Sequence, residues 1–256
     1  MVQERARIQT RTAQAATVFL RLQAPQLARQ LHPGQAVLIQ TGLGLDPFLR
    51  RTFHPIAIDA ETFSIRLTPD ADRGRAWLRM ATEGTEVDVL GPVGQGFTLP
   101  HHARRILCLG QGDAAWTLLP LVYATSARGL GVTLAIETTT KRQTIPARDL
   151  PLSVEYHVAT LDGSAGRRGD LRPLLSHLLT WADAVMAVGD MDFYRLLART
   201  IEDVRVILPR GFAQALYQTD FLCGFGACQA CAADVAGGRR RVCLRGPVFD
   251  LVDILR

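Results

Sequence analysis

The sequence contains no asparagine and only one lysine, Lys141, so arginine carries almost all of its formal charge of +5. It also lacks a run of about 18 apolar residues, which disfavours a transmembrane helix. Residues 1–17 are polar and arginine-bearing and do not contain the apolar stretch of a secretory signal. We therefore expect a cytoplasmic protein with no membrane insertion. The missing asparagine suits a heat-adapted protein.

A basic stripe interleaved with aromatic residues is missing as well, and this disfavours nucleic-acid binding. The arginines are scattered, and the densest run is residues 239–241. Scattered basic residues usually form a solvated face. The run at 239–241 is also suited to docking an acidic redox partner.

The hydrophobic pattern changes near residue 103. Before it, short strands are predicted at 37–40, 55–58 and 64–67, a spacing typical of an antiparallel barrel. After it, strands alternate with helices, which indicates a doubly wound parallel α/β sheet. The expected strands are 106–109, 132–137, 154–159, 184–188 and 204–208, and the expected helices are 114–128, 171–179 and 193–200. We predict three domains: a barrel at 1–102, an α/β domain at 103–212 and a cysteine-bearing module at 213–256.

The five cysteines are unevenly distributed, because four of them lie in the last 34 residues. Cys108 sits in an apolar run and is expected to be a buried small hydrophobe. The other four follow the spacing C-x4-C-x2-C plus a later cysteine, which is the plant-type [2Fe–2S] spacing. They are Cys223, Cys228, Cys231 and Cys243.

Four thiolates must converge on a small site to hold such a cluster. Gly224, Gly226 and Ala227 let the backbone wrap closely and direct amide N–H groups at the sulfurs. Structural zinc is the alternative, although zinc sites usually use C-x2-C pairs. We predict a [2Fe–2S] cluster on the four cysteines.

Residues 223–231 (C-G-F-G-A-C-Q-A-C) and 242–249 (V-C-L-R-G-P-V-F) resemble the electron-transfer subunit of class 1B dihydroorotate dehydrogenases. Two earlier segments agree with that family. Residues 49–54 (L-R-R-T-F-H) correspond to a flavin motif of the type L-R-R-P-x-S, and residues 90–97 (L-G-P-V-G-Q-G-F) resemble its G-P-L-G-N-G-F turn.

The resemblance implies a multidomain ferredoxin reductase-like fold: an antiparallel β-barrel for FAD, a doubly wound parallel α/β nucleotide domain and a small C-terminal [2Fe–2S] module. It implies a role in pyrimidine biosynthesis. In the family, electrons pass from an FMN-containing catalytic subunit through the cluster and FAD to NAD⁺, and the flavin converts between single electrons and a hydride. It further implies a heterotetramer of two catalytic and two electron-transfer subunits. No catalytic residue is assigned, and the chain is expected to be a redox subunit of an oxidoreductase complex.

The same resemblance implies which residues contact FAD. Arg51 would bind the pyrophosphate, because a guanidinium binds phosphate bidentately. Phe53 would pack on the ring system, and His54 stands in place of a hydroxyl residue near N5, where it adds bulk and a possible charge near pH 6–7. Gly74 keeps the backbone freedom of a glycine–threonine pair, with Arg75 in place of the threonine. The implied FAD contacts are Arg51, Thr52, Phe53, His54, Leu67, Thr68, Gly74 and Arg75.

The predicted nicotinamide site departs from the family pattern. Its glycine-rich turn is reduced to Gly110 and Gly112, and Asp113 places a negative charge where phosphates would bind. Gly189 is retained from a later motif, but Asp190 follows it. These residues disfavour NAD(H) binding. An electron-transfer adaptor with a degenerate nicotinamide site, serving another dehydrogenase or acceptor, is therefore the alternative function. A zinc-stabilised binding module without redox activity is a third.

Overall fold

A computed structural model describes residues 1–42, 44 and 46–255. Its contacts divide the chain into two compact units. The first comprises residues 1–96, 219–233 and 240–247, and the second comprises residues 97–218, 234–239 and 248–256. The cysteine-bearing loop thus belongs to the same unit as the N-terminal sheet. The division into three domains after residues 102 and 212 stays a prediction.

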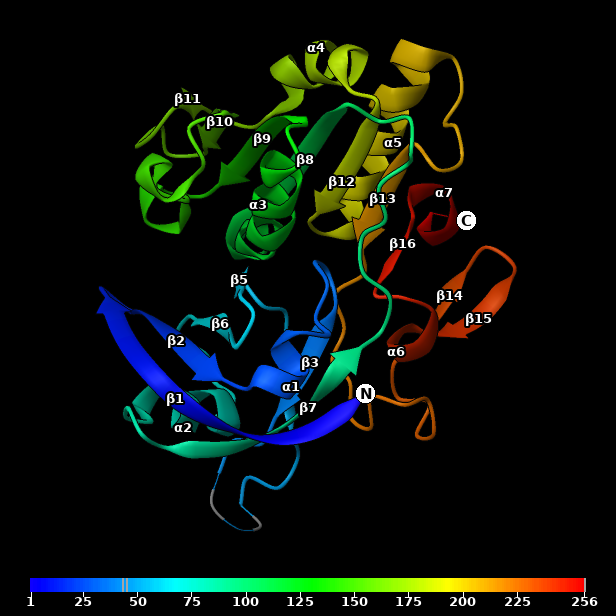
Figure 1. Ribbon diagram of the computed structural model, residues 1–256. Coiled ribbons are helices and arrows are strands. Elements are labelled where there is room, and N and C mark those ends of the chain that lie inside the picture. Colours follow the sequence, from blue (N-terminus) through cyan, green and yellow to red (C-terminus); the bar gives the residue numbers. More distant parts are fainter. Residues whose placement is uncertain (43, 45, 256) are drawn as a thin grey trace. The chain divides into compact units, whose positions relative to one another are not determined.

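The first unit is built on an antiparallel sheet of seven strands in the order β4-β3-β7-β1-β2-β6-β5 (Figure 1). The strands are β1 (Val2–Gln14), β2 (Thr17–Gln23), β3 (Ala36–Ile39), β4 (Arg51–Phe53), β5 (Ala57–Ile58), β6 (Thr62–Leu67) and β7 (Glu86–Val93). The helices are α1 (Pro25–Ala28) and α2 (Arg73–Met80). Buried and less buried residues alternate along β7, as expected for a sheet with one covered face. The predicted antiparallel β architecture is confirmed.

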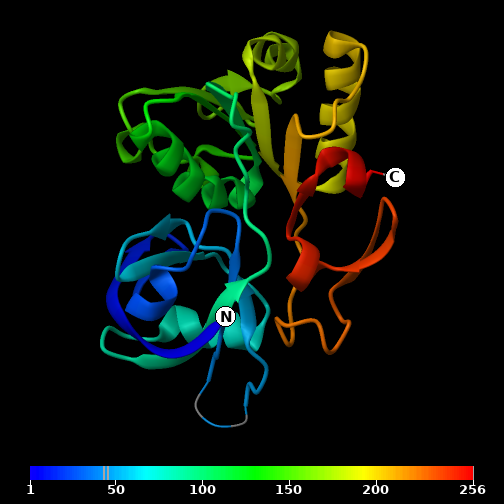
Figure 2. The same ribbon diagram turned by 45° about the vertical axis from the view of Figure 1, so that its right-hand side comes forward.

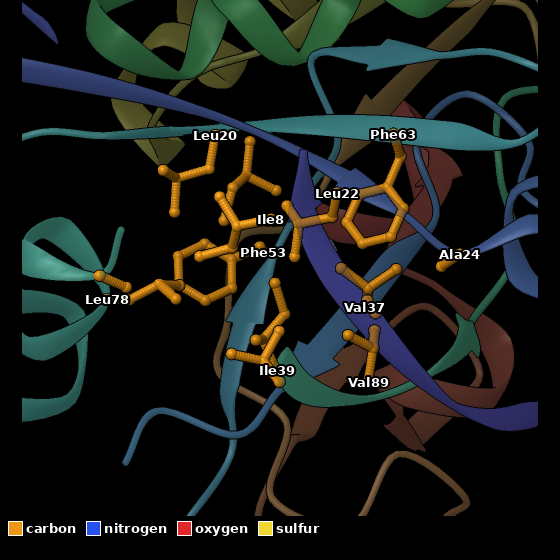
Figure 3. Close-up of a cluster of buried hydrophobic side chains, with 14 of the residues drawn as sticks. Ile8, Leu20, Leu22, Ala24, Val37, Ile39, Phe53, Phe63, Leu78 and Val89 are labelled. Atoms are coloured by element: carbon orange, nitrogen blue, oxygen red, sulfur yellow. The ribbon is translucent and has the colours of Figure 1, made fainter. Parts of the chain in front are cut away.

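The core of this unit collects apolar side chains from strands that are distant in the sequence. Figure 3 shows them converging, among them Ile8, Leu20, Val37, Phe53 and Phe63. Leu78 of α2 is fully buried in the same cluster. This burial fixes α2 against the sheet, so the start of the helix is held in a defined place next to β4.

The second unit contains a sheet of seven strands in the order β11-β10-β9-β8-β12-β13-β16. The strands are β8 (Arg105–Gln111), β9 (Gly131–Thr138), β10 (Val154–Thr160), β11 (Arg167–Arg168), β12 (Ala184–Val188), β13 (Ala213–Leu216) and β16 (Val248–Asp250). All neighbouring pairs are parallel except β13 and β16. Residues 106–110 of β8 and all of β12 are buried, as in a parallel sheet covered on both faces.

The helices of the second unit cover both sides of this sheet. Figure 2 shows α3 in green and α5 in yellow on opposite sides of the strands. The α-helices are α3 (Leu119–Ala127), α4 (Arg172–Trp181), α5 (Met191–Arg205) and α7 (Leu251–Ile254), and the 3₁₀ helices are η1 (Gly112–Leu118), η2 (Lys141–Gln143) and η3 (Ala147–Asp149). The doubly wound α/β architecture is confirmed.

Two sequence predictions for this unit need correction. A strand at 204–208 is wrong, because α5 continues to Arg205 and the chain turns at Val206 with a positive φ of 68°. The next strand is β13, at 213–216. The helix predicted at 114–128 begins instead as the 3₁₀ helix η1, and regular α-helix starts only at Leu119.

The cysteine-bearing segment lies between β13 and β16 in the sequence. It includes the hairpin of β14 (Ala232–Val235) and β15 (Gly238–Arg241), followed by α6 (Val242–Arg245). Both ends of the segment therefore lead into strands of one sheet. Within the part of the chain that the structure describes, no helix combines the length and apolar character needed to cross a membrane.

Candidate functional site

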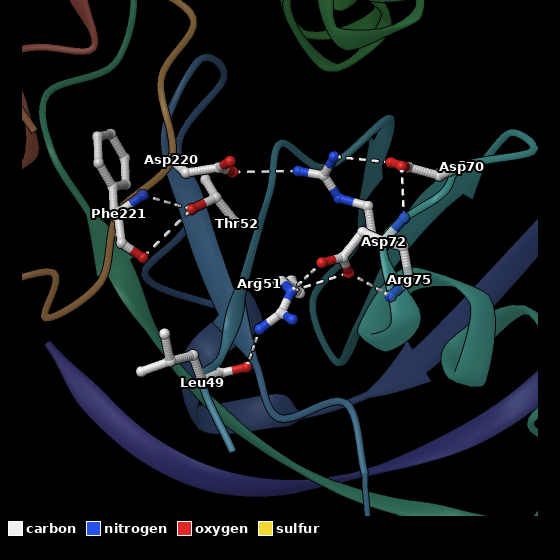
Figure 4. A network of polar contacts seen from close by, with 8 residues as sticks. All are labelled: Leu49, Arg51, Thr52, Asp70, Asp72, Arg75, Asp220 and Phe221. Carbon is white, nitrogen blue, oxygen red and sulfur yellow. Dashed lines mark hydrogen bonds and ion pairs between the residues drawn. The ribbon is translucent and has the colours of Figure 1, made fainter. Parts of the chain in front are cut away.

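Two arginines flank the start of α2 in the first unit (Figure 4). Arg51 Nε lies 2.9 and 3.0 Å from the two carboxylate oxygens of Asp72, and its guanidinium also donates to the Leu49 carbonyl. Asp72 is the N-cap of α2, because its carboxylate accepts from the Arg75 backbone N–H at 2.8 Å. Arg51 on β4 is thus bound directly to the first turn of the helix.

Arg75 bridges two further carboxylates. Its Nη1 donates to Asp70 at 2.9 Å and its Nη2 to Asp220 at 3.0 Å. The Arg51 guanidinium holds the pKa of the Asp72 carboxyl below its usual range, and Arg75 does the same for Asp70. Each guanidinium is therefore paired with carboxylate oxygens.

Gly74 lies in close contact with this arginine pair. A Cβ at Gly74 would lie 2.3 Å from Thr41 Oγ1 and 3.1 Å from Arg51 Cζ, so no larger residue fits without displacement. Thr41 is fully buried, and its hydroxyl has no hydrogen-bond partner in the structure. The site therefore has features that fit a pyrophosphate group: a helix start, two guanidinium groups, a close backbone approach and a buried hydroxyl without a partner.

The other predicted flavin residues have different surroundings. The side chain of Phe53 belongs to the barrel core, and Leu67 is buried at the end of β6. Thr68 follows it and is half-buried. Thr52 Oγ1 accepts from the Phe221 backbone N–H at 2.7 Å. The structure brings Arg51, Gly74 and Arg75 together, whereas flavin contacts at these four residues stay predictions.

His54 is held in its neutral form. Its Nδ1 lies 3.3 Å from the Gln35 carbonyl oxygen. Burial lowers the pKa of His54 to about 4, although backbone hydrogen bonds with Gln35 and Gly34 and the charge of Asp220 oppose this shift. The charge that the sequence predicted near pH 6–7 is therefore absent from this imidazole at neutral pH.

Cys223, Cys228 and Cys231 lie in the loop before β14, and Cys243 lies in α6, so all four predicted cluster ligands belong to the first unit. Cys231 and Cys243 are buried, Cys223 is half-buried and Cys228 is exposed, and all four are free thiols. The Cys243 backbone N–H donates to Cys231 Sγ at 3.4 Å. No three histidine, cysteine or acidic side chains among residues 1–42, 44 and 46–255 are placed to share one metal ion. A binuclear cluster needs only two protein ligands for each iron.

The surroundings shift the pKa values of Cys223 and Cys243 in opposite directions. Burial acts to raise the pKa of Cys223, but backbone N–H groups of Cys228, Phe225 and Ala227 point at its sulfur and lower the pKa to about 6. Burial and the neighbouring sulfurs of Cys231 and Cys223 raise the pKa of Cys243 to about 12. Negative charge on these neighbouring sulfurs is mutually unfavourable, and a cationic metal centre bound between them would offset it.

Two glycines bring this loop close to its surroundings, as the sequence predicted. Gly224 has a φ of 77°, and a Cβ there would lie 2.9 Å from Leu38 Cδ1 of β3. Gly226 has a φ of 83°, and a Cβ there would lie 2.5 Å from Leu244 Cδ1. Neither position admits a side chain without strain. The first glycine packs the loop on the barrel, and the second packs it on α6.

The turn at residues 90–97 contacts the segment that follows Cys243. A Cβ at Gly94 would lie 2.3 Å from the Gly246 carbonyl oxygen, and the Gln95 backbone N–H donates to the same oxygen at 2.5 Å. Two motifs that are more than a hundred residues apart in the sequence are therefore in direct contact. Residue spacing alone carries no signal for this pairing or for the bond between Thr52 and Phe221.

The predicted nicotinamide site lies at the carboxyl ends of β8 and β9. A pocket of ≈ 310 Å³ is lined there by Gln111, Gly112, Glu137, Thr138, Thr139 and Leu161. Gln111 Nε2 donates to Glu137 at 3.1 Å, and its Oε1 accepts from the Asp190 backbone N–H at 3.0 Å. Burial raises the pKa of the Glu137 carboxyl. Asp190 is the N-cap of α5 and accepts from the Phe193 N–H at 2.8 Å.

Comparison with known proteins gives one family and one fold. Residues 219–255 match the iron–sulfur cluster binding domain of dihydroorotate dehydrogenase B. The chain is 30% identical over 240 residues to the dihydroorotate dehydrogenase B (NAD(+)) electron transfer subunit of Geobacillus kaustophilus, with 91% of this chain and 90% of the relative covered. It is 27% identical over 242 residues to the subunit of that name from Desulforamulus reducens, with 91% and 90% covered.

Solved structures confirm the ferredoxin reductase-like fold. An NADH-dependent reduced ferredoxin-NADP oxidoreductase superimposes with a TM-score of 0.83 at 20% identity, covering 97% of this chain and 89% of the other. A ferredoxin NADP⁺ reductase from Neisseria gonorrhoeae with bound FAD and NADP superimposes with a TM-score of 0.64 at 15% identity, covering 80% and 91%. At these identities the likeness concerns the fold alone.

Proposed function

Since the chain belongs to the family of dihydroorotate dehydrogenase B electron transfer subunits, we propose that it carries FAD and a [2Fe–2S] cluster. It passes electrons from an FMN-containing dihydroorotate dehydrogenase catalytic subunit to NAD⁺ in pyrimidine biosynthesis. The observation that carries the proposal is the combination, within one compact unit, of an arginine-flanked helix start and a four-cysteine segment.

The residues at the start of α2 would hold the pyrophosphate of FAD. Arg51 and Arg75 would supply charge-assisted hydrogen bonds, and the lack of a side chain at Gly74 lets Thr41 and Arg51 lie against the start of the helix. The bound flavin would supply the exchange between single electrons and a hydride. His54 is neutral at physiological pH, so it adds no charge next to the cofactor.

Cys223, Cys228, Cys231 and Cys243 would be the cluster ligands. The three backbone N–H groups that point at Cys223 favour the thiolate, which is the form that binds iron. Hydrogen bonds to ligand sulfurs also affect the reduction potential of a cluster.

Cofactor analysis of anaerobically purified protein tests this proposal. The expected result is one FAD and two irons with two acid-labile sulfides per chain, and bleaching of the flavin absorption band by stoichiometric NADH. Protein that contains zinc and no iron would support the zinc-stabilised module instead. Protein with neither FAD nor iron would contradict the proposal entirely.

A second candidate function has specific support. Gln111 bridges Glu137 and the backbone of Asp190, and carboxylates at Asp113 and Asp190 stand at helix starts where phosphates would bind. A chain with these features could pass electrons from its partner to an acceptor other than NAD⁺. The experiment that separates the two is the NADH titration. A fully loaded protein whose flavin NADH leaves oxidised would favour the adaptor.

The proposed assembly is a heterotetramer of two catalytic and two electron-transfer subunits in the cytoplasm. Its support is the family to which the chain belongs. Co-expression with the FMN-containing subunit, followed by native mass measurement, tests it. A chain that does not co-purify with this subunit would contradict the assembly but would leave the cofactor proposal intact.

A further inference from the structure

Thr52 holds a segment that is distant in the sequence. Its hydroxyl accepts from the Phe221 backbone N–H at 2.7 Å, across 169 positions of the chain (Figure 4). Thr52 is 7% exposed and Phe221 is fully buried, so water cannot replace this bond. The L-R-R-P-x-S motif that residues 49–54 resemble has proline at this position, and proline has no hydroxyl. The hydroxyl is thus a departure of this chain from that motif.

A second contact holds the same segment one residue earlier. Asp220 accepts from Arg75 Nη2 at 3.0 Å. Asp70 accepts from Nη1 of the same guanidinium at 2.9 Å, and it lies outside the segment. The side chain of Asp220 is 67% exposed, so this ion pair is the weaker of the two contacts.

A third contact lies just beyond Cys223. Gly224 packs on Leu38 of β3, and Leu38 is the direct cross-strand partner of Thr52 on β4. Phe221 and Gly224 are thus fixed to the two members of one strand pair. Cys223 lies between them, and its sulfur receives backbone N–H groups from the loop that these contacts hold.

We propose that Thr52 is a positioning residue for electron transfer, which fixes Cys223 relative to strand β4 through its hydrogen bond to Phe221. Arg75 assists through Asp220. The inference rests on the proposed function, because β4 carries Arg51 of the FAD site and Cys223 is a cluster ligand there. Its consequence is that the buried hydroxyl of Thr52 contributes to the geometry between the flavin-binding strand and the cluster, beside the contacts of Asp220 and Gly224.

The test uses holoprotein with both cofactors and compares Thr52→Val with Thr52→Ser. Valine keeps the shape of threonine and removes the hydroxyl, whereas serine keeps the hydroxyl. In Thr52→Val, amide exchange at Phe221 is expected to rise about tenfold, because its buried N–H loses its partner. The EPR signal of the reduced cluster should change, and electron transfer from reduced flavin to cluster should slow. Thr52→Ser keeps the hydroxyl, so the exchange rate at Phe221 should stay near that of the unmodified chain.

A matched pair of variants tests the second contact. Asp220→Asn and Asp70→Asn each remove one carboxylate from the same Arg75 guanidinium. Only Asp220→Asn is expected to speed amide exchange in residues 219–222. If Thr52→Val does not fold, Thr52→Ala, which also removes the hydroxyl, is measured in its place, and unchanged amide exchange at Phe221 in that variant overturns the proposal.

Failure of the inference is distinct from failure of the proposed function. If Thr52→Val holds FAD and iron and matches the unmodified chain in exchange, EPR signal and electron-transfer rate, the inference is wrong and the function stands. The inference is also wrong if Asp70→Asn and Asp220→Asn affect residues 219–222 equally. An unmodified chain without FAD or iron would instead refute the proposed function.

Discussion

Two regions of this chain present the start of a helix as a candidate phosphate site, and they differ in the side chains around it. At α2 in the first unit, the capping carboxylate of Asp72 is paired with Arg51, and Arg75 lies in the first turn of the helix. In the second unit, η1 carries Asp113 in its first turn and α5 is capped by Asp190. The backbone dipole favours an anion at a helix start, and a carboxylate stands at all three starts, but at α2 two guanidinium groups lie beside it. The comparison teaches that side chains decide whether such a start is open to a ligand.

The largest effect is expected at the metal ligands, which have no counterpart in the second unit. Cys228→Ser should remove the iron and loosen residues 219–247, because few apolar side chains hold that segment. FAD should stay bound to the barrel. Iron and sulfide analysis with FAD quantification checks this, and unchanged iron content would contradict the ligand assignment. Cys108→Ser is a control, because Cys108 is buried within β8 of the other unit.

Removing a guanidinium beside the start of α2 should weaken FAD binding. In Arg51→Gln, the FAD dissociation constant should rise roughly 10- to 100-fold, because a hydrogen bond between charged groups is lost and Asp72 keeps its charge without that partner. Quenching of flavin fluorescence measures the affinity. Arg29→Gln removes an exposed arginine of the same unit and should leave it unchanged. Equal affinities in the two variants would show that Arg51 does not bind the pyrophosphate.

His54 gives the first unit a pH dependence. Its pKa is lowered to about 4 by burial, so between pH 6.5 and 4 the unfolded chain binds more protons at this residue than the folded chain does. The stability that it contributes is present above pH 6.5 and is lost as the pH falls towards 4. At pH 5 the loss is about 2 kcal/mol relative to pH 7.

Denaturant unfolding at both pH values measures this effect. The difference in unfolding free energy between pH 7 and pH 5 should be smaller in His54→Gln than in the unmodified chain. His32→Gln, which removes an exposed histidine, serves as the control. An identical pH dependence in all three proteins would show that His54 is not held neutral.

The smallest effect is expected when a carboxylate is removed from the predicted nicotinamide site of the second unit. Asp113→Ser removes a carboxylate from the first turn of η1 and should lower the NADH concentration for half-maximal flavin reduction by about two- to fivefold. Asp192→Asn, whose side chain is 90% exposed and paired with Arg195, is the control. If Asp113→Ser needs the same NADH concentration for half-maximal flavin reduction as Asp192→Asn and the unmodified chain, Asp113 does not hinder NADH binding.

The sequence predicts features that depend on neighbouring residues better than it predicts contacts between residues far apart in the chain. Local patterns were sufficient for the strand at 184–188, where a short apolar run coincides with β12. They failed at 204–208, because β-branched residues there follow an amphipathic helix that continues to Arg205. Cysteine spacing predicted the iron–sulfur domain that residues 219–255 match, while the ligand set itself stays a prediction.

Contacts between distant segments could not be predicted. Nothing in the sequence indicated that the Thr52 hydroxyl accepts from the backbone N–H of Phe221, 169 positions away, and the flavin contact assigned to Thr52 stays a prediction. Asp220 was not singled out at all, although it binds Arg75. Such pairings form because residues 219–233 fold against the N-terminal sheet, and neither composition nor periodicity predicts that arrangement.

The place of the cysteine segment in the topology has a consequence for cofactor loading. The segment is an excursion that leaves one sheet at Leu216 and rejoins it at Val248, where β16 pairs with β13. A chain emptied of metal is therefore tethered at both ends, and the entropy of closing such a loop increases only slowly with its length. Iron loss and reloading can then occur as a local, repeatable event, while the rest of the molecule keeps its structure.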